Sequence, residues 1–170
     1  MTLAEFTNPA LLVPELEGKD VGAVIAELSQ AMQREGRVAD WRSLCQAALN
    51  RESLVSTETQ AGMAFPHARL PGLKNVSFAL GRKREPFLWG TGSPIAFGAP
   101  VRLVFLIAAP EDDSMKYLQL ISGLVSLAKA PALVEELYAA QDAIQMLAVL
   151  QQVQVRTNSQ QTESAATARR

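Results

Sequence analysis

The first segment with helical spacing of apolar residues lies between residues 20 and 36. Asp20 precedes it and Gly36 follows it, and these residue types commonly begin and end helices. The apolar positions that recur every three or four residues are Val21, Val24, Ile25, Leu28 and Met32. The pattern predicts an amphipathic helix with one face in the core.

A second segment of the same kind follows a possible Asp40 cap and runs to about Arg51. Its apolar positions are Trp41, Leu44, Cys45, Ala48 and Leu49. Cys45 is the only cysteine, so it forms no internal disulfide and fits a reducing compartment. We expect it to pack in the core. The periodicity then ends in a polar loop, SLVSTETQAG, before the short run MAFP.

Two strands are predicted in the centre of the chain. VSFALGR at 76–82 alternates apolar with small or polar residues, whereas VRLVFLIA at 101–108 is nearly continuously apolar, which is typical of a strand covered on both faces. The segment between them, KREPFLWGTGSPIAFGAP, contains several prolines and glycines. It leaves room only for short strands at 87–89 and 95–97.

Helical patterns return after the acidic turn EDDS. One helix is predicted to end before Pro131, and its apolar face contains Tyr117, Leu118, Ile121, Leu124, Val125 and Ala128. A short helix around 133–138 follows, and Asp142 with Gln145 suggests a capping box for another. From about Arg156 the sequence is polar, without periodicity, and predicts a disordered tail.

The order of these elements predicts an α/β fold, in which a mixed β-sheet is flanked by helices on both sides. Strands and helices do not alternate strictly enough to require a purely parallel sheet. We expect one domain over residues 1–155 and a tail over residues 156–170.

Composition and charge narrow the possible functions. Hydrophobic residues make up 48% and charged residues 19%, as in soluble globular proteins. The formal net charge is -1, which argues against nucleic acid or an anionic membrane as a partner. The apolar run at 103–110 is far shorter than the roughly 20 residues of a membrane-spanning helix. The N-terminus does not read as a secretory signal, so we expect a cytoplasmic protein without direct membrane insertion.

Several kinds of chemistry have little support. One histidine and one cysteine do not make a metal site, and GTGSPI at 90–95 is better interpreted as a turn than as a dinucleotide-binding loop, so no cofactor is expected. No GxSxG motif accompanies the histidine. The acidic run at 111–113 is interpreted as a turn or cap before a helix.

The single histidine, His67, follows Pro66 in the stretch GMAFPHARL. Neutral imidazole is nucleophilic near pH 7, and the phosphoramidate that it forms is labile enough to pass a phosphoryl group onward. Pro66 restricts the backbone before the histidine, and a nearby carbonyl is expected to bind one ring nitrogen while the other faces solvent. Arg51 or Arg69 is a candidate for binding phosphoryl oxygens.

The stretch NRESLVSTETQAGMAFPHAR resembles the active-site segment of the fructose- and mannitol-type IIA components of the bacterial phosphoenolpyruvate-dependent sugar phosphotransferase system. The resemblance includes Arg51 with Glu52, Ser56 with Thr57, and PHAR. The segment at 94–110 and the later YLQLISGLVSLA are also similar, so it extends over roughly residues 20–150.

This resemblance implies a phosphocarrier whose catalytic residue is His67. It would accept a phosphoryl group from the histidine-containing phosphocarrier protein HPr and pass it to a IIB component for sugar uptake. Arg51 would lie beside the phosphohistidine, and Ser56 and Thr57 would support the phosphate. The family fold is also a mixed sheet flanked by helices.

Two positions differ from the family pattern. Tyr117 stands where family members usually have a second histidine, and tyrosine donates a hydrogen bond but adds no positive charge near neutral pH. STETQAG replaces a glycine-rich STGIGNG-like loop, and an inward-pointing Glu58 would repel phosphate. These two differences motivate one alternative, a non-catalytic interaction domain with reduced transfer. A second alternative is a nitrogen-type regulatory IIA relative, in which the phosphorylation state of His67 controls binding to a target protein.

Overall fold

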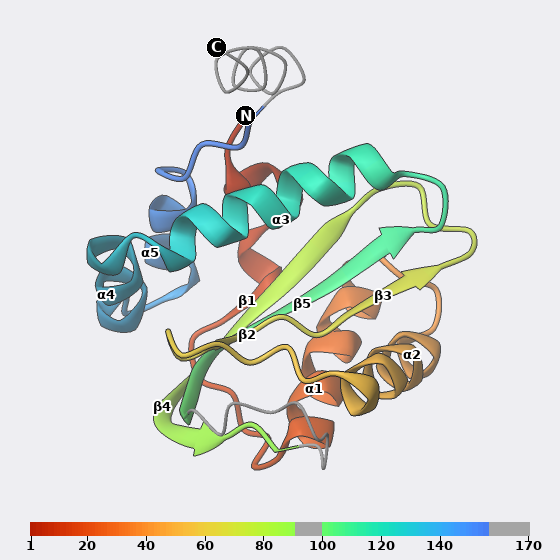
Figure 1. Cartoon of the computed structure of the whole chain (residues 1–170), viewed down its shortest axis with the longest axis horizontal. Helices are drawn as coiled ribbons and strands as arrows, with labels where there is room; N and C mark the ends of the chain where they lie inside the picture. The colour runs from red at the N-terminus through yellow and green to blue at the C-terminus, as the bar shows by residue number, and fades with distance from the viewer. Residues whose placement is uncertain (91–99, 157–170) are drawn as a thin grey trace, which may run out of the picture.

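The computed structural model describes residues 1–90 and 100–156, and within them five strands form one mixed sheet (Figure 1). The strands are β1 (Leu12–Val13), β2 (Met63–Ala64), β3 (His67–Leu70), β4 (Ser77–Leu88) and β5 (Pro100–Pro110). β5 pairs antiparallel with β4 and parallel with both β2 and β3, while β1 pairs parallel with β4. The predicted α/β class and mixed sheet are confirmed.

Helices cover both faces of this sheet, as predicted (Figure 1). One face carries α1 (Val21–Arg34) and α2 (Trp41–Leu54). The other carries α3 (Ser114–Ala128), α4 (Pro131–Ala139) and α5 (Ala143–Leu150), together with the short 3₁₀ helix η1 (Leu3–Phe6). A second 3₁₀ helix, η2 (Pro9–Leu11), leads from η1 into β1.

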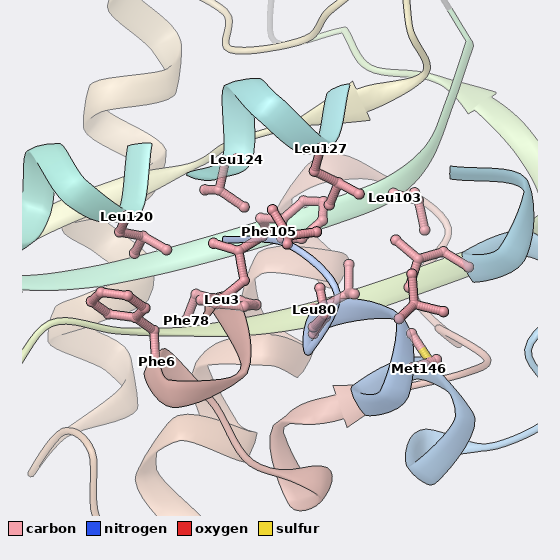
Figure 2. Close-up of a cluster of buried hydrophobic side chains, with 14 of the residues drawn as sticks. Leu3, Phe6, Phe78, Leu80, Leu103, Phe105, Leu120, Leu124, Leu127 and Met146 are labelled. Carbon is pink, nitrogen blue, oxygen red and sulfur yellow. The ribbon is translucent and has the colours of Figure 1, made fainter. Parts of the chain in front are cut away.

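The side chains of β5 divide the interior into two cores. Leu103, Phe105 and Ile107 face α3, α4 and α5, whereas Val104, Leu106 and Ala108 face α1 and α2. Figure 2 shows the first core, in which Phe105 lies among side chains of η1, β4 and α3. Burial of each of the valine, leucine, isoleucine and phenylalanine side chains among them contributes about 1.5–3 kcal/mol. The strand is therefore buried on both faces, as its continuous apolar sequence predicted.

Aspartates begin four of the helices. Asp20, Asp40, Asp113 and Asp142 each accept a hydrogen bond from a backbone N–H in the first turn of α1, α2, α3 and α5. The predicted caps are confirmed, although the side chain of Gln145 accepts from the N–H of Gln141 instead of completing a box with Asp142. The turn at 111–113 thus serves as the cap of α3.

Several boundaries differ from the sequence prediction. α2 continues to Leu54, three residues beyond Arg51, and residues 87–88 belong to the end of β4 after a register shift between Arg82 and Phe87. The N-terminal elements η1, η2 and β1, and the strands β2 and β3, were not predicted. The expected strand at 95–97, most of the GTGSPI turn and the tail from 157 lie outside the described residues.

No single helix in the described part of the chain is long and apolar enough to cross a membrane. α3 and α4 meet the length and composition criteria only as a pair, and the two helices are bent by 88° relative to each other.

Candidate active site

His67 is the first residue of β3 and pairs with Ile107 of β5. The N–H of Ile107 donates to the carbonyl of Pro66 at 3.0 Å, so the proline is fixed to the sheet although it lacks a donor of its own. Ala68, the next residue, is buried in the core under α2. Because successive side chains alternate along a strand, His67 and Arg69 both lie on the opposite face, towards α3.

One ring nitrogen of His67 is occupied by the backbone. Nδ1 lies 2.9 Å from the carbonyl oxygen of Phe65. A carbonyl oxygen only accepts hydrogen bonds, so in the neutral ring Nδ1 carries the proton and Nε2 carries the lone pair. This is the arrangement expected from the sequence, and Phe65 supplies the carbonyl. In the neutral form of this half-buried ring, Nε2 is therefore the nitrogen with the lone pair.

The Phe65 peptide is held in turn by a hydroxyl of the preceding loop. The N–H of Phe65 donates to Oγ1 of Thr57 at 2.9 Å. Oγ1 of Thr57 donates to the carboxylate of Glu52, with distances of 2.9 and 3.1 Å to its two oxygens. A continuous set of hydrogen bonds thus runs from Glu52 through Thr57 and Phe65 to the ring of His67.

Glu52 is the anchor of this network. Its side chain is buried at the end of α2, where it accepts from the N–H of Thr57 at 2.7 Å and from Nε1 of Trp89 at 2.6 Å. Ser56 adds a longer contact of 3.4 Å through its hydroxyl. A buried carboxylate is stable when several donors surround it. Glu52 therefore fixes the loop that follows α2 against the sheet.

Tyr117 of α3 lies beside the histidine. The centroids of the His67 and Tyr117 rings are 6.2 Å apart, and the guanidinium carbon of Arg69 lies 4.5 Å from the centroid of the Tyr117 ring. A cation over an aromatic face is attracted by the ring quadrupole. The ring of Tyr117 therefore contacts both His67 and the positively charged guanidinium group of Arg69.

The other residues predicted for the site take different positions. Nη1 of Arg51 donates to the carbonyl of Val55 at 3.3 Å, at the end of its own helix, and in the described part of the chain Arg51 forms no hydrogen bond with His67. Ser56 and Thr57 direct their hydroxyls to Glu52. Glu58 is buried, with 2% of its surface exposed. The roles of Arg51, Ser56 and Thr57 towards phosphate stay predictions.

Exposed apolar side chains adjoin the segments that form the site. Leu54 and Val55 precede Ser56 and Thr57, and Met115 and Leu118 flank Tyr117 on α3; all four are exposed. Two open pockets, of about 660 and 490 Å³, lie elsewhere on the surface, and His67 lines neither. The half-buried His67 thus has exposed apolar side chains on both segments that border it, the loop after α2 and the start of α3.

Three contributors to the site were not predicted. The Phe65 carbonyl and the indole of Trp89 act through contacts that no sequence motif marks. The position of Glu52 was only weakly indicated by the sequence, in which this acidic residue lies at the end of a predicted helix and is followed by several hydroxyl residues that could bind it. Among the described residues, no group of three or more His, Cys, Asp or Glu side chains is placed to hold a metal ion.

Comparison with known proteins assigns the family. Residues 5–153 match the model of the phosphoenolpyruvate-dependent sugar phosphotransferase system, EIIA 2. The chain is 32% identical over 127 residues to the fructose-specific EIIABC component of Bacillus subtilis, covering 75% of this chain and 19% of that protein. It is 27% identical over 151 residues to a nitrogen regulatory protein of Bradyrhizobium diazoefficiens, covering 88% of this chain and 95% of that protein.

The fold agrees with this assignment. The crystal structure of the nitrogen regulatory protein IIA-Ntr from Neisseria meningitidis superimposes with a TM-score of 0.74 at 27% identity, covering 87% of this chain and 98% of that one. The chain spans about a fifth of the length of the fructose-specific relative but nearly all of the Bradyrhizobium and Neisseria nitrogen regulatory proteins. The chain therefore belongs to the EIIA type 2 family of the phosphoenolpyruvate-dependent sugar phosphotransferase system.

Proposed function

We propose that this protein is a phosphocarrier that accepts a phosphoryl group from phosphorylated HPr on Nε2 of His67 and passes it to a IIB component. The observation that carries the proposal is the 2.9 Å contact between Nδ1 of His67 and the Phe65 carbonyl, which leaves the lone pair on Nε2. Family membership supports phosphoryl exchange between components of the system. The name of the fructose-specific relative, EIIABC component, indicates a protein in which an A part is joined to B and C parts.

In the proposed transfer, the lone pair of Nε2 attacks the phosphorus and forms an N–P bond, while the N–P bond of the donor histidine breaks and its electron pair returns to the donor ring. Nδ1 of His67 stays protonated and hydrogen-bonded to the Phe65 carbonyl throughout. The phosphorylated ring is therefore an imidazolium. When the phosphoryl group moves to IIB, the bond between Nε2 and phosphorus breaks and its electron pair returns to the ring, which becomes neutral imidazole. Neither step then needs a proton from solvent.

The test uses the full chain with phosphoenolpyruvate, enzyme I and HPr. Intact-mass analysis is expected to show one acid-labile phosphoryl group, which is absent from His67→Ala and from a mixture without HPr. A labelled phosphoryl group is then expected to move to a IIB protein. Absence of the label from the native protein, or its persistence in His67→Ala, would overturn the proposal.

A regulatory role is the second candidate, in which the phosphorylation state of His67 controls binding to a target protein. It is favoured by the match to nearly the full length of a nitrogen regulatory protein. Pull-downs with the phosphorylated native protein and with His67→Ala are expected to recover different partners. Recovery of only a sugar-specific IIB protein would count against this role. A cytoplasmic location stays a prediction from the sequence.

A further inference from the structure

A pocket of about 490 Å³ lies at the end of β5 opposite to the one that pairs with His67. Arg102 of β5 lines it, five positions before Ile107, which corresponds to about 17 Å along a strand. Arg82 and Arg84 of β4 contribute two more guanidinium groups, and Tyr138 and the residues after it close the pocket from α4. Neither the sequence motifs nor the phosphotransfer site accounts for this cluster.

Arg82 lines the pocket and is almost fully buried, with 5% exposed. Its Nε donates to the carbonyl of Pro14 at 3.0 Å. Its Nη1 donates to carbonyls at the C-terminus of α4, including that of Leu137 at 2.7 Å and that of Tyr138 at 3.1 Å. These bonds satisfy the last carbonyls of the helix. They also fix a positive charge in place at the pocket.

Arg102 brings a second charge with unused donor capacity. Its guanidinium carbon lies 4.1 Å from the centroid of the Tyr138 ring, which orients the group. Its Nε is buried and has no hydrogen-bond partner among the residues that the structure describes. An unsatisfied buried donor costs about 1–3 kcal/mol. The bonds of Arg82 to the carbonyls of α4 explain why Arg82 is buried, but they do not explain the unpaired Nε of Arg102.

The charges in the pocket are poorly balanced. Arg84 pairs with Glu15, but both side chains are largely exposed, so the pair neutralises little. Burial, and then the positive charges of Arg84 and Arg102, lower the pKa of Arg82 below its usual value. The guanidinium groups therefore repel one another in the absence of a ligand, and a bound anion would relieve this repulsion.

We propose that the Arg82, Arg84 and Arg102 pocket binds a small molecule that carries a phosphate or diphosphate group. Guanidinium groups bind phosphate oxygens through paired N–H donors. Arg102 is oriented by the Tyr138 ring and has an unpaired Nε among the described residues, whereas Arg82, whose Nε and Nη1 bind carbonyls, contributes a fixed positive charge. The volume lies within the range of small-molecule sites. This binding does not depend on phosphotransfer at His67.

Titration calorimetry of the full chain with pyrophosphate tests the proposal, at constant ionic strength maintained with sodium chloride. We expect saturable binding at one site, weakened at least tenfold in Arg102→Gln and also weakened in Arg84→Gln. Arg34→Gln is the matched control, because Arg34 is an exposed arginine in the last turn of α1, outside the pocket. It is expected to bind as the native protein does.

The same titration is repeated with orthophosphate and with adenosine diphosphate. Equal binding of pyrophosphate and the nucleotide would show that the phosphate groups alone are recognised, whereas tighter binding of the nucleotide would show that the pocket also holds an organic part. Circular dichroism verifies that each variant is folded. Absence of saturable binding to the native protein at millimolar pyrophosphate, or equal binding to folded Arg102→Gln, would overturn the proposal.

Discussion

Nδ1 of His67 lies 2.9 Å from the carbonyl oxygen of Phe65, two residues earlier in the chain. Pro66 separates the two residues, and its fixed φ restricts how the backbone turns between them. The Phe65 peptide is itself bound through its N–H to Thr57. The orientation of the imidazole ring is therefore set by the backbone of its own segment, and the network from Glu52 holds that segment in place.

The first prediction concerns the atom that is modified. Phosphorylation is expected on Nε2, because Nδ1 is occupied by the Phe65 carbonyl and holds the proton. Two-dimensional nitrogen–proton spectra of the ring, recorded on phosphorylated and free protein, distinguish the two nitrogens. A phosphoryl group on Nδ1 would show that the contact with Phe65 breaks before transfer.

The second prediction concerns Thr57. Thr57→Val keeps the shape of the side chain but removes the hydroxyl between Phe65 and Glu52, so the peptide before His67 loses its support. We expect transfer to slow by about tenfold or more, since small displacements of a reacting group are costly. The free energy of unfolding should fall by about 1–3 kcal/mol. Rapid-quench measurement of phosphohistidine formation and urea denaturation supply the two values.

Thr59→Val is the matched control for this change. Thr59 belongs to the same loop, but among the residues that the structure describes its hydroxyl accepts only from the N–H of Met63, at 3.4 Å, and does not bind Glu52. Its transfer rate is expected to stay within about twofold of the native rate, which corresponds to the roughly 0.5 kcal/mol typical of substitutions that break no important contact. If Thr57→Val transfers as fast as Thr59→Val, the Glu52 network does not position His67.

The third prediction separates the ring of Tyr117 from its hydroxyl. The contacts of Tyr117 with His67 and Arg69 involve the aromatic ring. Tyr117→Phe should therefore transfer nearly as fast as the native protein. Tyr117→Ala should lower the rate by roughly the two- to fivefold expected when an exposed cation–π contact that holds Arg69 is lost. Steady-state transfer from HPr measures both. Equal loss in the two variants would instead assign a role to the hydroxyl.

Tyr117→His tests the non-catalytic alternative. Histidine restores the residue type that the family resemblance implies at this position and adds a group that is partly charged near neutral pH. If the native protein transfers weakly and the histidine variant transfers much faster, the chain is an interaction domain with reduced transfer. Rapid transfer by the native protein would exclude that alternative.

The fold could be predicted from the sequence where a pattern was local. α1 and α2 follow from apolar spacing and aspartate caps, and β5 follows from its continuous apolar run. β2 and β3 could not be predicted in the same way, because two and four residues are too few to show a period. Their strand conformation comes from pairing with β5, which is distant in the sequence.

Some of the geometry around His67 could be predicted from the sequence, and some could not. His67 stands out as the single histidine after a proline, and the need for a carbonyl at one ring nitrogen follows from imidazole chemistry. The position of Trp89 against Glu52 depends instead on the long β4 strand, which brings residues 37 positions apart together. Likewise, Arg69 reaches Tyr117 only because β3 and α3 border the same face.

The last prediction tests how α3 is held over the sheet. A Cβ atom at Gly123 would lie 2.6 Å from Cδ2 of Leu3 and 3.0 Å from Cγ2 of Val155, and both of these side chains are buried. Gly123→Ala should therefore lower the free energy of unfolding by about 1–3 kcal/mol, because the cost of overpacking exceeds the gain of about 0.5–1 kcal/mol in helix propensity. Urea denaturation measures the change.

Gly22→Ala is the control for helix propensity, because a Cβ atom at Gly22 in α1 would meet only Oδ1 of Asp20 at 3.5 Å, an ordinary contact. This variant should be more stable than the native protein by up to about 1 kcal/mol. α3 carries Tyr117, so a shift of the helix in Gly123→Ala should also reduce transfer, whereas Gly22→Ala should not. Stabilisation by both substitutions would show that η1 yields to α3, and that the N-terminal segment does not fix the helix beside His67.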